Sequence, residues 1–162
     1  MSARDENLIL EFLDQASSLE LILANMYNLF LFEKTSTEDS DFWKQLAQEE
    51  LSHAALLKSA MSNPEMSKQL APDATNDLLQ EVVKDKKWAT TLLIKFSEVK
   101  PDRLTAFNAA VEAEKTAGEL HFQKIMTKES DSWFVKVLRE LNEYDRDHLR
   151  RIYLYMTDNN IA

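Results

Sequence analysis

Hydrophobic side chains recur every three or four residues along most of this chain, which is the spacing of an amphipathic helix. The pattern predicts long helices at residues 4–34, 39–62, 101–128 and 131–157, and a further helix at 76–98. The links within the first pair and within the last pair are short, whereas the link between the pairs is long. We therefore expect an all-α four-helix bundle of two helical hairpins, with a crossover that contains an extra helix.

Residues with strong positional preferences mark the expected helix ends. Asn63-Pro64 stops the second helix, and a loop is expected from residue 64 to 75. Pro101 fits the first turn of the helix at 101–128, and Ser130 is a plausible N-cap for the last helix.

The composition supports a single helical domain. The 162 residues suffice for one continuous core, and they include one glycine and three prolines, fewer than a sheet protein with many tight turns needs. Cysteine is absent, so the chain has no disulfide, thiolate nucleophile or Cys-ligated metal. Any metal site must use oxygen and nitrogen ligands.

The net charge of -9 argues against nucleic acid or an anionic membrane surface as a partner. The N-terminus has acids beside its apolar start and does not read as a signal peptide. Polar residues interrupt the most apolar run, 19–32, which is too short to span a bilayer. The expected location is the cytoplasm.

Each of the four long helices places an acid in the middle of its apolar stripe. Two of these acids are followed by a histidine three residues later, on the same helix face. The residues concerned are Glu20, Glu50, His53, Glu114, Asp145 and His148. Glu49 points about a third of a turn away from this stripe and is expected to be solvated.

The same residues form an internal repeat. Glu20 and Glu114 are 94 positions apart, and both members of the Glu50/His53 pair recur 95 positions later as Asp145/His148. If the two hairpins pack face to face, the repeat predicts a site with approximate two-fold symmetry.

Buried ionised carboxylates cost several kcal/mol each when they are unpaired, so something positive should lie among them. No lysine or arginine lies on the four stripes near the acids. A pair of divalent cations explains the pattern, because the metal charge offsets the acids and neutral histidines bind as ligands. One Glu from each of two helices, with Glu-x-x-His from each of the others, is the ligand arrangement of di-iron and di-manganese carboxylate bundles.

With this arrangement the chain resembles the rubrerythrin-like branch of the ferritin-like superfamily over nearly its whole length. The resemblance implies a non-haem centre of two iron ions that reacts with dioxygen or hydrogen peroxide, as an oxidase or peroxidase in oxidative-stress defence. It also implies the metal ligands: bridging Glu50 and Asp145, terminal Glu20 and Glu114, and His53 and His148 on one metal each.

The chain departs from the family in three places. Asp145 stands where the family usually has Glu, and Ala117 and Gly118 stand where rubrerythrin peroxidases carry a further carboxylate. A rubredoxin-like segment, which needs cysteines, is absent, so electrons are expected from an external donor protein.

Several alternatives remain open at the level of sequence. Tyr27 is a catalytic candidate that could hydrogen-bond a metal-bound oxygen or a carboxylate, or an ordinary buried aromatic residue. His121 is expected near the site or on the surface, not as a ligand. The metal could be manganese or zinc, and the function could be iron storage or structural metal binding without turnover. We expect a homodimer.

Overall fold

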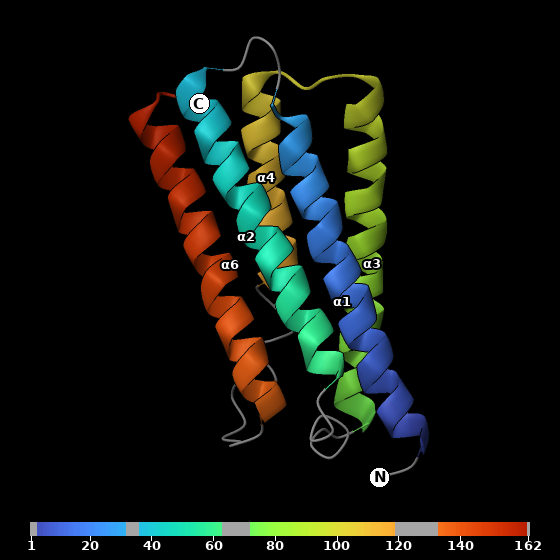
Figure 1. Cartoon of the computed structure of the whole chain (residues 1–162). Helices are drawn as coiled ribbons and strands as arrows, with labels where there is room; N and C mark the ends of the chain where they lie inside the picture. The colour runs from blue at the N-terminus through green and yellow to red at the C-terminus, as the bar shows by residue number, and fades with distance from the viewer. Residues whose placement is uncertain (1–2, 32–35, 63–71, 119–132, 162) are drawn as a thin grey trace.

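The computed structural model describes residues 3–31, 36–62, 72–118 and 133–161, and all the regular structure within these ranges is α-helical (Figure 1). The helices are α1 (Ala3–Leu29), α2 (Thr37–Met61), α3 (Pro72–Glu98), α4 (Arg103–Gly118) and α6 (Trp133–Asp158). The predicted all-helical class is confirmed.

The helices form two antiparallel hairpins with α3 between them in sequence. The first helix, α1, packs extensively against both α2 and α3, while α4 packs against α6 and a smaller contact joins α2 to α6. Figure 1 shows α3 running from the end of the molecule where α2 finishes to the end where α4 begins, so α2 and α4 point the same way. The helix in the connector therefore covers one side of α1.

Large aromatic side chains from α1, α2 and α4 fill much of the core. Phe12, Tyr27, Phe30, Trp43 and Phe107 are each at most 2% exposed. Burying one such ring stabilises a fold by roughly 1.5–3 kcal/mol. These rings come from α1, α2 and α4, the helices that also carry Glu20, Glu50 and Glu114.

The first helix is shorter than its hydrophobic pattern predicts, ending at Leu29 and not at residue 34. The backbone N–H of Phe30 donates to the Tyr27 carbonyl at 3.1 Å, and that of Leu31 to the Asn28 carbonyl at 3.2 Å. Bonds to the residue three positions back tighten and close a helix. The apolar run thus continues beyond the helix that it helps to form.

The sequence pattern predicted the wrong first residue for two helices that begin at or near a proline. The helix that follows Pro101 begins at Arg103, because Asp102 caps it: the Thr105 N–H donates to Asp102 Oδ1 at 2.7 Å. The crossover helix starts at Pro72, four residues earlier than the predicted 76, with proline at its first position.

At the start of α2, Ser36 accepts a hydrogen bond from the Asp39 N–H at 3.1 Å, which fixes the beginning of the helix at Thr37. The predicted cap at Ser130 and the end of the helix predicted at 101–128 fall in residues 119–132, outside the described residues. Among the described helices, none has the length and hydrophobicity needed to cross a membrane.

Candidate metal centre

The structure brings together six of the seven residues that the sequence singled out for a site. They come from four helices, and none is more than 7% exposed: Glu20 and Tyr27 of α1, Glu50 and His53 of α2, Glu114 of α4, and His148 of α6. On α2 the three-residue spacing puts the glutamate and the histidine on the same helix face, one turn apart.

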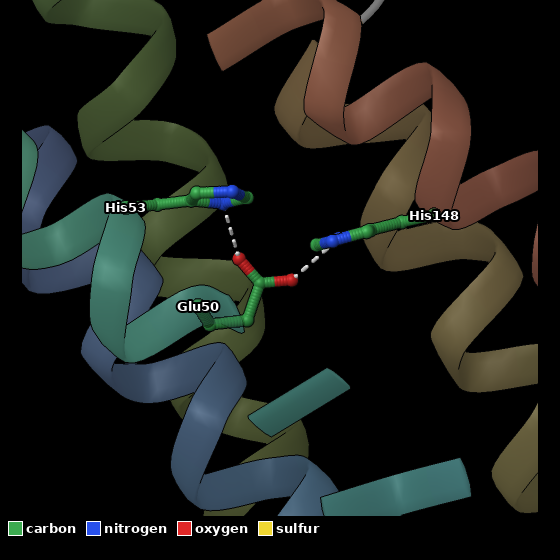
Figure 2. Close-up of side chains that lie close together, drawn as sticks. All are labelled: Glu50, His53 and His148. Atoms are coloured by element: carbon green, nitrogen blue, oxygen red, sulfur yellow. Dashed lines mark hydrogen bonds and ion pairs between the residues drawn. The ribbon is translucent and has the colours of Figure 1, made fainter. Parts of the chain in front are cut away.

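The Glu50 carboxylate lies between two imidazoles (Figure 2). Its Oε2 is 3.1 Å from His53 Nδ1, and its Oε1 is 3.0 Å from His148 Nδ1. Ligand atoms of these three residues all lie within 4.8 Å of one another. Two ligands on opposite sides of one transition-metal ion are at most roughly 4.2–4.4 Å apart, so only a small inward movement would let all three bind one ion.

Glu114 joins this group from α4. Its Oε2 is 3.5 Å from His148 Nδ1, and its Oε1 accepts a hydrogen bond from the Tyr27 hydroxyl. Burial, and then the negative charge of Glu114, raise the pKa of Tyr27 well above its usual value. Tyr27 therefore keeps its proton and fixes one oxygen of the carboxylate, leaving the other directed toward the histidine.

Three buried polar atoms of the cluster lack a hydrogen-bond partner: Glu20 Oε2, Glu50 Oε1 and His148 Nδ1. The last two are 3.0 Å apart, but their angles do not meet hydrogen-bond geometry. Buried polar atoms are usually hydrogen-bonded. A metal cation can bind several oxygen and nitrogen atoms at once, which a single hydrogen-bonding proton cannot. The unsatisfied atoms fit a metal at this position.

Two acids of the cluster, Glu20 and Glu50, are held away from their ionised forms. Burial, and then the charge of Glu50, raise the pKa of Glu20, while burial and the charge of Glu114 raise the pKa of Glu50.

The two histidines differ. Burial lowers the pKa of both, but contacts with Glu114 and Glu50 outweigh it at His148 and raise its pKa. In the metal-free cluster His148 is thus the main positive charge. Because a metal must displace protons from such ligands, its binding should release protons and weaken at low pH.

Glu49 is not simply solvated, so that part of the sequence interpretation is wrong. Its Oε2 lies 2.9 Å from His148 Nε2, and both its oxygens accept hydrogen bonds from the Arg151 guanidinium. Arg151 Nε is in turn 2.9 Å from Asp147. A carboxylate on the outer nitrogen of a ligating histidine fixes its tautomer and orientation. The helical wheel of α2 alone could not show this, because the partner residues lie on α6.

A groove of about 590 Å³ between α2 and α6 leads to the two histidines. Its lining includes Glu49, His53, Tyr144 and His148. The Tyr144 ring stacks on His53, with centroids 5.0 Å apart, and is 43% exposed. Small molecules could approach the imidazoles from this side. The hydrophobic pattern gave no reason to select Tyr144.

The remaining predicted ligand, Asp145, belongs to α6, but its side chain lies outside the described residues. His121 is also outside the described residues. The described part of the cluster therefore contains five of the six predicted metal ligands.

Comparisons of the chain with protein-family models, with curated proteins and with solved structures found no match.

Proposed function

We propose that the chain is a ferritin-like metalloprotein that binds two iron ions in the middle of the bundle and reduces dioxygen or hydrogen peroxide. The convergence of Glu50, His53 and His148 is the observation that carries the proposal, because three buried ligand atoms lie within 4.8 Å of one another. Glu20 and Glu114 add two carboxylates from the other two helices. Among the described residues, no lysine or arginine forms an ion pair with these three glutamates.

The choice of iron rests on the resemblance to rubrerythrin-like proteins, since carboxylate and imidazole ligands also suit manganese and zinc. Bound iron would supply the electrons by cycling between its ferrous and ferric states. The chain's own residues hold the site: Tyr27 orients Glu114, and Glu49 orients His148. The groove between α2 and α6 gives small oxidants a path to the histidines.

A single redox-inert ion such as zinc is the second candidate. It is favoured by the compact group of three buried ligands in the described residues, to which Glu20 or Glu114 would add the fourth ligand that a structural zinc site needs. Such an ion would neutralise the buried acids and stabilise the bundle without turnover.

The test is to load the metal-free protein anaerobically with ferrous iron, measure the iron bound per chain, and then follow the absorption spectrum after adding oxygen or peroxide. We expect about two irons per chain and rapid oxidation by at least one of these oxidants. Glu50→Gln should lose both properties, whereas Glu112→Gln, at an exposed position on the same helix as Glu114, should keep them.

Protein that binds iron but is inert to both oxidants would contradict the redox function. Protein purified without added metal that contains one zinc per chain and no iron would favour the second candidate. A preference for zinc in titration would not, because most sites of this kind bind zinc more tightly than ferrous iron.

A further inference from the structure

A continuous series of aromatic rings crosses the bundle from Tyr27 to Tyr155. Tyr27 stacks with Trp43, with ring centroids 5.9 Å apart. Trp43 contacts Phe107 at 4.3 Å, and Phe107 lies nearly parallel to Tyr155 at 5.5 Å. These four rings come from α1, α2, α4 and α6, so the series links every helix that contributes to the candidate metal centre.

Both ends of the series are tyrosines whose hydroxyls donate to carboxylates. Tyr27 donates to Glu114 in the cluster, and Tyr155 donates to Asp39 Oδ1 at 2.8 Å. Removing one electron from a phenol makes its proton strongly acidic, so a carboxylate already hydrogen-bonded to the hydroxyl makes that oxidation easier. Phenylalanine would suffice for packing, as Phe107 does where its ring stacks on Tyr155. Packing alone therefore does not require the tyrosine hydroxyls.

The middle of the series lies beside solvent. A hollow of about 600 Å³ is lined by Trp43 and Phe107 together with Asp39, Arg103 and the exposed Glu38. Trp43 itself is 2% exposed, so its ring forms the wall of the hollow and is protected from reaction with solutes. A donor in this hollow would therefore be separated from the cluster by two oxidisable rings, Trp43 and Tyr27.

We propose that Trp43 and Tyr27 carry single electrons from an outer-sphere one-electron reductant in this hollow to the metal centre, an inference that rests on the proposed redox function. Tyr27 gives one electron to a centre oxidised by hydrogen peroxide, and its phenolic proton passes to Glu114. Trp43 then gives one electron to Tyr27, which recovers its proton from Glu114, and the external reductant gives one electron to Trp43. The net transfer is one electron, with no net movement of protons.

The route can be tested in metal-free protein. Because the chain has no cysteine, Glu38→Cys provides a single attachment point for a ruthenium polypyridyl photo-oxidant at the edge of the hollow. After a flash in the presence of an electron acceptor, the label draws electrons in the reverse direction along the same two rings, so we expect a tryptophan radical followed by a tyrosyl radical, detected by transient absorption. Tyr155→Phe in the same background separates a Tyr155 radical from one on Tyr27.

In this labelled protein, Tyr27→Phe should remove the later tyrosyl signal and lengthen the life of the tryptophan radical. Trp43→Phe should abolish transfer to Tyr27, whereas Trp88→Phe, a half-buried tryptophan on α3, should leave it unchanged. Circular dichroism checks that each variant is folded, and Tyr27→Phe removes only a hydroxyl. Tyrosyl signals that are the same in wild type, Tyr27→Phe and Trp43→Phe would overturn the route.

A second measurement adds hydrogen peroxide to iron-loaded protein in the presence of hexaammineruthenium(II), a mild outer-sphere one-electron donor. We expect Trp43→Phe to slow oxidation of the donor without changing the iron content, and Trp88→Phe to have no effect. An unchanged rate in Trp43→Phe would overturn the route. Iron that no oxidant can oxidise would instead defeat the proposed function, while the radical measurement in metal-free protein would still decide the route.

Discussion

Asp39 and Glu50 are both buried carboxylates on α2, but their surroundings differ. Asp39 accepts hydrogen bonds from Arg103 Nε and Nη2, both at 2.7 Å, and from the Tyr155 hydroxyl at 2.8 Å. Burial opposes its ionisation, but these hydrogen bonds outweigh burial and lower its pKa. Asp39 thus has a complete set of partners within the protein, and they join α2 to α4 and α6.

Glu50 lies among two histidines and two further acids, and its Oε1 has no hydrogen-bond partner. Its pKa is raised by burial and by the charge of Glu114. The comparison shows that partners decide whether a buried carboxylate stays charged. The cluster around Asp39 is complete, whereas the cluster around Glu50 has more acid than its imidazoles can balance and is suited to bind a cation.

The largest expected difference between the two clusters is their response to metal. A divalent metal at about a thousand times its dissociation constant should stabilise the wild-type protein by about 4 kcal/mol, because it binds the folded state. Glu50→Gln should lose most of this gain, and Asp39→Asn should keep it. Thermal unfolding with metal and with chelator measures both. Equal stabilisation of Glu50→Gln and wild type would place the metal elsewhere.

The next largest effect should be the loss of stability when the hydrogen bonds around Asp39 are weakened. Asp39→Asn removes the charge from the hydrogen bonds to Arg103, so we expect a loss of about 2–3 kcal/mol at neutral pH. Because folding lowers the pKa of Asp39, its contribution is fully present above its unfolded pKa and lost as pH falls through the lower folded value.

Urea unfolding at several pH values measures this loss, and the difference between wild type and Asp39→Asn should shrink below about pH 4. Asp41→Asn is the matched control. Asp41 is exposed, and its ion pair with the exposed Lys44, at 3.6 Å, contributes little to stability. A loss that is constant with pH would show that the charge on Asp39 is not its cause.

A smaller effect is expected at the outer side of His148. Glu49→Gln removes the charge that faces His148 Nε2, and should weaken metal binding by about 10- to 100-fold. Glu140→Gln is the control: Glu140 lines the same groove but accepts its hydrogen bond from Tyr144. Calorimetric metal titration measures both variants. Similar losses in the two would indicate a general effect of groove charge.

The smallest effect should be that of Glu20→Gln in metal-free protein. Because burial already favours the neutral form of Glu20, an amide should change the free energy of unfolding by no more than about 1 kcal/mol. Urea unfolding beside Asp39→Asn makes the comparison direct. A loss as large as that of Asp39→Asn would mean that Glu20 is charged and fully paired.

The hydrophobic period predicted the helices well, since each depends on residues close in sequence. It also placed Glu50 and His53 on one face of α2, because three residues are nearly one helical turn. Helix ends were less predictable: α4 begins at Arg103 after its cap Asp102, and α3 begins at Pro72, whereas the apolar pattern pointed to other residues. A cap is a single local hydrogen bond, which the spacing of apolar residues does not report.

Contacts between helices were also predicted only in part. The sequence repeat suggested that acids from four helices meet, and Glu20, Glu50 and Glu114 do lie in one cluster. The sequence allowed Tyr27 a hydrogen bond to a carboxylate but did not identify Glu114, 87 residues away, as its partner. It gave no sign that Glu49 pairs with Arg151, 102 residues away.

The sequence by itself determined the helical class and the buried positions of three glutamates and two histidines, because helix periodicity is a property of neighbouring residues. Only the tertiary structure decided which carboxylate is paired with a cationic side chain and which is left to compete with other acids. Asp39 meets Arg103 and Tyr155 at separations of 64 and 116 residues. Such pairings depend on how the helices align along their lengths, which is set by packing across the whole bundle.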